Sequence, residues 1–251
     1  PADVVWSVVG GIGHIDQNGF FMSGAAAGGN LGKVIAIAVP AYAGIAGVQA
    51  EVWIRVVPGN PANITVTPES LTIAAGNSQK FFAVVTDVYS NAVPVEVNWR
   101  IESDKGEKQA EVRVDSQTTA EVTFRKAGKC RLIAEVSGIR ATSDIVIVPG
   151  SLRGIDISAL SLIPVPGDSP YYVVTSGNTV QFTATGYDAS GNYISIAPLW
   201  SVRGGIGTIR GDGLFRGGTA GNGQAVATVG DVSAVVDVKV VPGLLNSVSV
   251  S

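Results

Sequence analysis

Short stretches of alternating apolar and polar residues run along almost the whole chain, each bounded by Gly, Pro, Asn or Asp. A period of two places successive side chains on opposite faces of a strand, so each stretch predicts a β-strand with one face in a core. No stretch of useful length shows the helical period. The pattern therefore predicts an all-β fold.

The predicted strands fall into groups of the size expected for one sandwich. The last part of the chain has strands expected at 156–158, 179–187, 199–203, 207–210, 213–216, 224–229 and 234–241. The middle part has them at 78–86, 95–101, 112–115, 120–125, 129–136 and 142–148. Strand groups of this number and spacing are typical of an immunoglobulin-like β-sandwich.

A long internal repeat accompanies the strands. Residues 6–15 and 200–209 both read Trp-Ser-Val, then Gly-Gly-Ile-Gly, and both lead to a Gly-aromatic close, at Gly19-Phe20-Phe21 and Gly213-Leu214-Phe215. A more diverged copy around Trp99 lacks the glycine-rich turn. A repeat of this period predicts a tandem array of similar domains.

Val-Pro-Gly punctuates the array at residues 57–59, 148–150 and 241–243, and a short alternating segment follows each time. The spacing matches one seven-stranded sandwich of about 100 residues. We therefore expect a partial immunoglobulin-like domain at 1-58 that lacks its first two strands, complete domains at 59-150 and 151-243, and at 244-251 the first strand of a further or partner domain.

Aromatic residues recur at the predicted core positions. Trp6, Trp99 and Trp200 occupy one position of the repeat, where a ring can span the roughly 10 Å between two sheets. A sugar-stacking platform is the alternative for these rings. The other predicted core residues are Phe21, Phe82, Phe182 and Phe215.

These motifs resemble the bacterial immunoglobulin-like domains of group 2, related to those of the invasin and intimin adhesins, over nearly the whole chain. The carrying segments are Ser176-Gly177-Asn178, Val180-Gln181-Phe182-Thr183-Ala184, Asp188-Ala189-Ser190-Gly191-Asn192, Trp200-Ser201-Val202, Gly213-Leu214-Phe215 and Val238-Lys239-Val240. The middle part matches at Ala75-Gly76-Asn77, Phe82-Ala83-Val84, Asp87, Asn91 and Trp99. The resemblance implies a sandwich module of a secreted or surface-displayed protein, without shared catalytic residues.

Composition narrows the function classes. Charged residues make up 15% of the chain, below the usual figure of about 25%. Either turn-rich sandwiches or a surface buried in an assembly explains this. The net charge is −3 and no basic cluster occurs, so no nucleic-acid partner is predicted. No run of about 18 apolar residues occurs, so no membrane span is predicted.

The residues of common catalytic sites are few. His14 is the single histidine, and its counterpart in the repeat is Thr208. No nucleophile elbow or His-Glu-x-x-His motif is present. The single cysteine, Cys130, excludes an intrachain disulfide and shares its alternation phase with core positions. We therefore predict that the protein is not an enzyme.

Two loops at 87–91 and 188–192 carry several oxygen-bearing side chains. Calcium between domains is one interpretation, because Ca²⁺ prefers such ligands. Ordinary turn chemistry is the other, since Asp, Ser, Gly and Asn are the common turn residues. No cofactor is otherwise predicted.

The leading functional hypothesis is a non-enzymatic extracellular or cell-surface structural protein that forms a stalk, fibre, sheath or S-layer-like assembly. Its expected partners are further copies of itself or neighbouring domains of a longer chain. Head-to-tail strand complementation would use the apolar residues Leu244, Leu245, Val248 and Val250. The alternative is an adhesin or carbohydrate-binding accessory module, with a glycan or receptor as ligand and exposed tyrosines at Tyr42, Tyr89, Tyr171, Tyr172 or Tyr193.

Overall fold

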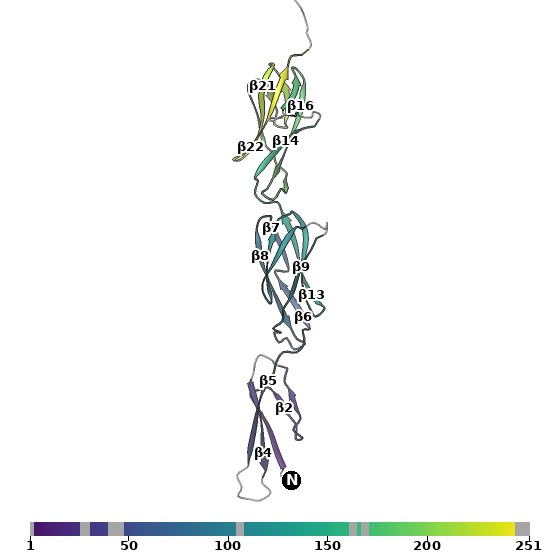
Figure 1. Ribbon diagram of the computed structural model, residues 1–251, viewed down its shortest axis with the longest axis vertical. Helices are drawn as coiled ribbons and strands as arrows, with labels where there is room; N and C mark the ends of the chain where they lie inside the picture. Colours follow the sequence, from purple (N-terminus) through teal and green to yellow (C-terminus); the bar gives the residue numbers. More distant parts are fainter. Residues whose placement is uncertain are drawn as a thin grey trace, which may run out of the picture. The chain divides into compact units, whose positions relative to one another are not determined.

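The computed structural model describes residues 3–25, 31–39, 48–103, 108–160, 165–166 and 171–243. Regular structure in these residues consists of β-strands alone, which confirms the predicted all-β class of immunoglobulin-like sandwich (Figure 1). No helix long and apolar enough to cross a membrane occurs in this described part of the chain.

The chain divides into two compact units. Unit 1 comprises Pro1–Leu71, Ser78–Thr123 and Lys129–Ile145, and unit 2 comprises Thr72–Asn77, Phe124–Gly128 and Val146–Ser251. Their boundary passes through the strands of the middle part, so the boundaries expected from the Val-Pro-Gly repeat stay a prediction.

The N-terminal strand set consists of β1 to β5. Its strands are β1 (Asp3–Val9), β2 (Gly13–Ile15), β3 (Phe21–Ser23), β4 (Leu31–Val39) and β5 (Gln49–Arg55). An antiparallel sheet has the order β1-β4-β5, and β2 pairs with β3 in a hairpin. Strands β5 and β3 are therefore edge strands of their sheets.

The central strand set forms two four-stranded sheets, β10-β11-β8-β6 and β7-β13-β12-β9. Phe81 and Val122 from the first sheet are fully buried, as is Leu132 from the second. The strands are β6 (Asn63–Thr67), β7 (Ser70–Ala74), β8 (Ser78–Thr86), β9 (Asn98–Ser103), β10 (Ala110–Ser116), β11 (Thr119–Phe124), β12 (Gly128–Val136) and β13 (Ile139–Val148).

The C-terminal sandwich consists of β14 to β22. One sheet has the order β14-β16-β20-β19 with β17 paired to β16, and the other has the order β15-β22-β21-β18. The strands are β14 (Gly154–Ala159), β15 (Tyr171–Thr175), β16 (Thr179–Tyr187), β17 (Tyr193–Ile194), β18 (Leu199–Arg203), β19 (Gly207–Ile209), β20 (Leu214–Gly217), β21 (Gly221–Val229) and β22 (Val232–Val241).

Sequence periodicity missed β7, β15 and β17. In β15 the residues Tyr-Tyr-Val-Val-Thr do not alternate between apolar and polar, so no period of two marks the strand. This strand runs parallel to β22, whereas its sheet is otherwise antiparallel. Strand β15, which the sequence did not predict, is therefore an edge strand of this sheet.

Candidate functional site

A Trp–Ala cross-strand pair marks the same position in all three strand sets and defines which strands correspond. The pairs are Trp6 with Ala36, Trp99 with Ala134, and Trp200 with Ala227. By these pairs β1, β4 and β5 correspond to β18, β21 and β22. The shared Gly-aromatic segments make β2 and β3 correspond to β19 and β20.

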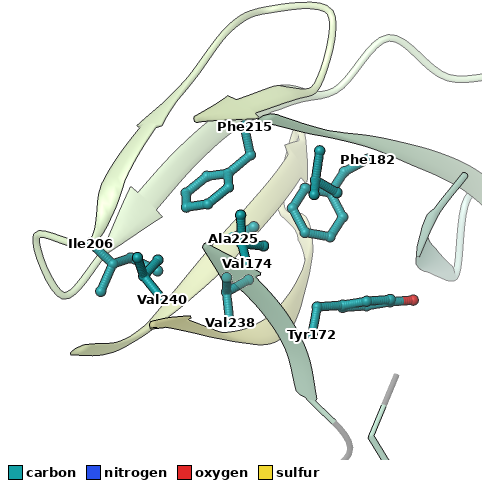
Figure 2. Close-up of a cluster of buried hydrophobic side chains, with 9 residues drawn as sticks. Tyr172, Val174, Phe182, Ile206, Phe215, Ala225, Val238 and Val240 are labelled. Atoms are coloured by element: carbon teal, nitrogen blue, oxygen red, sulfur yellow. The ribbon is translucent and has the colours of Figure 1, made fainter. Parts of the chain in front are cut away.

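The C-terminal sandwich shows these five strands covered by others. Strand β15 pairs with β22, and β16 pairs with β20, so both sheets extend beyond the repeated strands. The ring centroid of Phe182 on β16 lies 5.5 Å from that of Tyr172 and 6.1 Å from that of Phe215. Figure 2 shows these rings in one cluster with Val238 and Val240 of β22, and Ile206 lies beside Val240. A closed apolar core results.

The N-terminal strand set has no counterparts of β14 to β17 among its described residues. In the C-terminal sandwich four strands, β14 to β17, precede the Trp strand, and β15 and β17 among them were not predicted. The partial domain at 1-58 that lacks its first two strands stays a prediction. Phe21 is half-buried, whereas its counterpart Phe215 is 0% exposed. Val52 on β5 is 55% exposed. Among the described residues, no strand pairs with the second edge of β5, and Val52 on its inner face is exposed.

The opposite face of β5 carries a different arrangement. Trp53 is 59% exposed, and Lys33 Nζ lies 5.4 Å from its ring centroid and 2.5 Å from Glu51 Oε2. A cation over an indole face is attracted by the ring quadrupole. In the C-terminal sandwich Gln224 corresponds to Lys33 and Asp237 corresponds to Trp53. Gln224 donates a 2.9 Å hydrogen bond to Asp237. These positions form cross-strand surface pairs.

The loop at 188–192 of unit 2 is organised around one carboxylate. Asp188 Oδ1 accepts hydrogen bonds from the backbone N–H groups of Ser190 and Asn192, both at 2.8 Å. Asp188 Oδ2 accepts from the N–H of Gly150 at 2.7 Å and from Asn192 Nδ2 at 2.8 Å. Asn192 also donates to the carbonyl of Arg125 at 2.8 Å and accepts from the N–H of Ala127 at 2.8 Å. The Asp–Asn pair thus joins three backbone segments.

The loop at 87–91 of unit 1 repeats this arrangement. Asp87 Oδ1 accepts from the N–H groups of Tyr89 and Asn91, and Oδ2 accepts from the N–H of Gly59, each at 2.9 Å. Asn91 Nδ2 donates to Asp87 and to the carbonyl of Ala25 at 2.7 Å. Gly59 and Gly150 are the last residues of their Val-Pro-Gly segments, so each loop binds the junction that precedes its own strand set.

Both carboxylates are held in the ionised form. Burial by itself raises the pKa of Asp87, but hydrogen bonds from the Asn91 side chain and from the backbone of Gly59, Asn91 and Tyr89 outweigh it and lower the pKa to about 2. The pKa of Asp188 is about 2 for the same reasons, with donors Asn192, Gly150 and Ser190. These charges are satisfied by N–H donors.

This geometry favours turn chemistry over calcium at both loops. Each carboxylate oxygen of Asp87 and Asp188 already accepts hydrogen bonds from N–H groups, which a bound cation would have to displace. In the part of the chain that the structure describes, no group of three or more His, Cys, Asp or Glu side chains could hold a metal ion.

The predicted core residues differ in burial. Phe182 and Phe215 are 1% and 0% exposed, and Trp99 is 7% exposed. Trp6 and Trp200 are half-buried, like Phe21. The core prediction for Phe82 is wrong: its side chain is 51% exposed, and Phe81 is buried instead. The inward phase of β8 is set by Phe81, Ala83 and Val85, so alignment on Phe182 placed the wrong residue of the Phe-Phe pair inside.

The remaining predicted sites are dispersed. Tyr89 and Tyr193 are 65% and 76% exposed, Tyr171 is half-buried, and Tyr172 is buried, so these tyrosines do not form one platform. Cys130 is 5% exposed. Tyr42 and the proposed intermolecular strand residues, Leu244, Leu245, Val248 and Val250, lie outside the described residues.

Comparisons with known proteins find distant similarities. No family model matches the chain. Over 175 residues it is 27% identical to Ice-binding protein 1 of Shewanella frigidimarina, a match that covers 66% of this chain and 17% of that protein. The chain thus spans about a sixth of the length of this curated relative.

Solved structures with similar arrangements include domains 4–9 of the surface layer protein SbsC, with a TM-score of 0.37, 17% identity, and coverage of 96% of this chain and 39% of that one. The Escherichia coli adhesin FdeC gives 0.40 at 18% identity, covering 85% and 75%. Cadherin domains 1–5 of protocadherin gamma B2 give 0.48 at 12% identity, covering 98% and 54%.

Proposed function

We propose that this chain is a non-enzymatic structural segment of an extracellular or cell-surface protein, built from tandem immunoglobulin-like modules of the bacterial group 2 type. The observation that carries the proposal is the recurrence of one strand pattern, with the same Trp–Ala pair and the same Asp–Asn loop bound to the preceding junction. In a tandem array each repeat contacts only its neighbours, which suits a chain of modules to a spacer or scaffold role.

Single-molecule pulling tests the tandem organisation directly. Modules of about 90 residues, extended at about 3.3–3.6 Å per residue, should each release about 30 nm of chain when they unfold. The intact chain should therefore give two separate events of this length. One event that releases most of the chain at once would contradict independent modules.

Localisation and assembly form the second test. Antibodies raised against the chain should label intact cells of the source organism, and negative-stain images of the native material should show filaments, sheaths or lattices. Labelling only after cell lysis would contradict a surface role.

A second candidate, an adhesin or carbohydrate-binding module, is favoured by one hollow in unit 2. A volume of about 570 Å³ is lined by Tyr171 with polar side chains that include Gln224, Asp237 and Lys239. An aromatic face beside amide, carboxylate and amine groups suits a polar ligand with an apolar face, such as a sugar. Glycan-array binding that Tyr171→Ala abolishes would support this candidate, and an array without binding would exclude it for the sugars displayed.

A further inference from the structure

The outer face of the β1-β4-β5 sheet is apolar. Gly32 of β4 faces the interior, where it lies against Ile12, so the neighbouring residues along β4 point outward. The exposed apolar residues of this outward face are each between 38% and 59% exposed, and they are Val5, Val9, Leu31, Ile37, Val39 and Trp53. We name these six residues the outer apolar face. A contiguous exposed group of this kind marks an interaction site, whereas scattered single residues do not.

The other two strand sets carry charged or polar residues at several of the same positions. Counted from the Trp–Ala pairs, the matching residues are Glu102 and Arg203 for Val9, Lys129 and Asn222 for Leu31, and Glu135 and Thr228 for Ile37. Trp53 has the charged counterpart Asp237. The strand pattern therefore forms without apolar residues at these positions. Their presence in the N-terminal strand set points to a contact outside that set.

Strands that close a core of this kind leave the outer face uncovered. In the C-terminal sandwich the strands outside the repeated five lie either beside β22, as β15 does, or in the opposite sheet. Leu199 and Lys239, which correspond to Val5 and Arg55, are exposed in that closed sandwich. The outer apolar face therefore requires a partner other than the strands of its own sandwich.

An ion pair within this face limits the chemistry of the partner. Lys33 Nζ lies 2.5 Å from Glu51 Oε2 and 5.4 Å from the ring centroid of Trp53. Both charged side chains are partly exposed, so a partner that covers the face also removes water from them. A buried ion pair is favourable only if further polar groups satisfy its remaining donors and acceptors. The partner should therefore offer a carboxylate and an amine surrounded by apolar residues.

We propose that the outer apolar face packs against the same face of a second copy of this chain, about a two-fold axis that passes between Lys33 and Glu51. This axis sets Lys33 of each copy opposite Glu51 of the other, so that the two ion pairs form one network of four charges. The surrounding apolar side chains leave water on both copies, which supplies the favourable free energy. Two sheets packed face to face in this way lie about 10 Å apart. The inference rests on the proposed structural function and names a partner for it.

Sedimentation velocity of the intact chain over a range of concentrations tests the proposal. The parent chain should form dimers as its concentration rises. Ile37→Thr combined with Trp53→Asp installs the residues of the C-terminal sandwich and should raise the Kd of dimerisation at least tenfold. The matched control is Phe82→Thr on β8, because Thr183 holds the equivalent position when both are counted from the Asp–Asn loops. This control removes an exposed apolar side chain elsewhere and should leave the Kd unchanged.

Charge reversal tests the crossed pairing. Lys33→Glu gives each copy two carboxylates at the centre of the face, and Glu51→Lys gives each copy two amines. Either variant alone should therefore dimerise at least tenfold more weakly than the parent. An equal mixture of the two, with one of them fluorescently labelled, should recover dimers that contain one copy of each. A mixture that stays monomeric while the parent dimerises would overturn the two-fold arrangement.

Two further outcomes would overturn the proposal. One is a parent chain that stays monomeric at every concentration, and the other is an Ile37→Thr, Trp53→Asp variant that dimerises as well as the parent. Phosphatidylcholine vesicles, added in a parallel flotation assay, identify the rival partner, because a monomeric parent that floats with them would assign the face to a lipid surface. Circular dichroism checks the folding of each variant. If the double variant misfolds, Leu31→Asn alone replaces it and should also raise the Kd.

The outcome is separable from the proposed function. Two unfolding events of module length from a chain that stays monomeric would leave the modular structural role intact and exclude this partner. Loss of the two events would count against the modular role itself, whether or not the chain dimerises.

Discussion

The N-terminal strand set and the C-terminal sandwich carry the same five strands but differ in what lies over them. Phe215 and Val238 are 0% and 1% exposed beneath β15 and β16. Their counterparts Phe21 and Ile54 are half-buried, because no described strand covers them. The five strands adopt their pairing in both places, so local pattern and turns specify the strands, whereas a closed core requires the additional ones.

The glycine-rich turn behaves alike in both regions. Ile12 and Ile206 are 0% and 1% exposed, so each turn inserts its isoleucine into the interior, even though Val52 on the inner face of the N-terminal strand set is 55% exposed. A Cβ on Gly32 would lie 2.7 Å from Ile12 Cγ1, and one on Gly223 would lie 2.7 Å from Ile206 Cγ1. Glycine is thus required opposite the isoleucine in both strand sets.

The largest expected effect separates the two cores. Phe215→Ala removes a fully buried ring and should lower the free energy of unfolding of the C-terminal sandwich by about 3–5 kcal/mol, through lost burial and the cavity left behind. Phe21→Ala should cost less, because the ring is already partly in water. Denaturant unfolding followed by hydrogen exchange at each strand set measures both losses.

The chain supplies the control for this comparison. Phe82→Ala alters an exposed side chain on β8 and should change stability little, whereas Phe81→Ala should resemble Phe215→Ala. Equal losses from Phe21→Ala and Phe215→Ala would show that something covers the N-terminal strand set in solution.

A smaller effect is expected from filling the glycine position. Gly223→Cys places a side chain 2.4 Å from the carbonyl oxygen of Arg203 and against Ile206, so overpacking should cost about 1–3 kcal/mol. The central strand set carries Cys130 at the corresponding position and lacks the Gly-Gly-Ile-Gly turn. Ile206→Ala creates a cavity of its own, so the two changes are compared in a double-mutant cycle: Gly223→Cys should cost less in the Ile206→Ala background than in the parent chain. An equal cost in both backgrounds would mean that backbone contacts alone impose the glycine.

Sequence reasoning succeeded where the period was regular. Strands such as β16, β18 and β22 alternate over five or more residues, and their positions were predicted from that alternation. It failed for β15, whose five residues do not alternate, and for Phe82, where two adjacent phenylalanines leave the inward phase undecided. In both cases pairing with a strand distant in sequence decides the outcome, and no local pattern reports it.

The Asp–Asn loops were recognised from sequence as oxygen-rich, but their partners were not. Gly150 and Arg125 lie far from Asp188 and Asn192 along the chain, and their backbone groups carry no sequence signal. The sequence showed only that the loops at 87–91 and 188–192 match each other. The structure adds that N–H donors from distant segments surround each carboxylate.

Acid should weaken both loops in the same pH range. Each Asp has a pKa of about 2 when folded, below its ordinary 3.8, so its stabilisation is complete above about pH 4 and is lost as the pH falls through 2. Asp188→Asn should therefore unfold at lower denaturant than the parent at pH 7, and the difference should shrink between pH 4 and 2. Asp87→Asn provides the matched case in unit 1. A difference that stays constant down to pH 2 would contradict the role of the ionised carboxylate.

The smallest expected effect is that of calcium removal. Because Asp87 and Asp188 have their oxygens bound by N–H donors, chelation by EDTA should leave the thermal unfolding midpoints of the parent chain unchanged. Adding millimolar Ca²⁺ should leave them unchanged as well, whereas a site filled at this concentration would stabilise the folded state in proportion to its occupancy. A calcium-dependent rise in the midpoint that Asp188→Asn removes would show that the loop rearranges to bind the ion. If only one of the two variants, Asp87→Asn or Asp188→Asn, removed this rise, the two loops would differ in calcium binding.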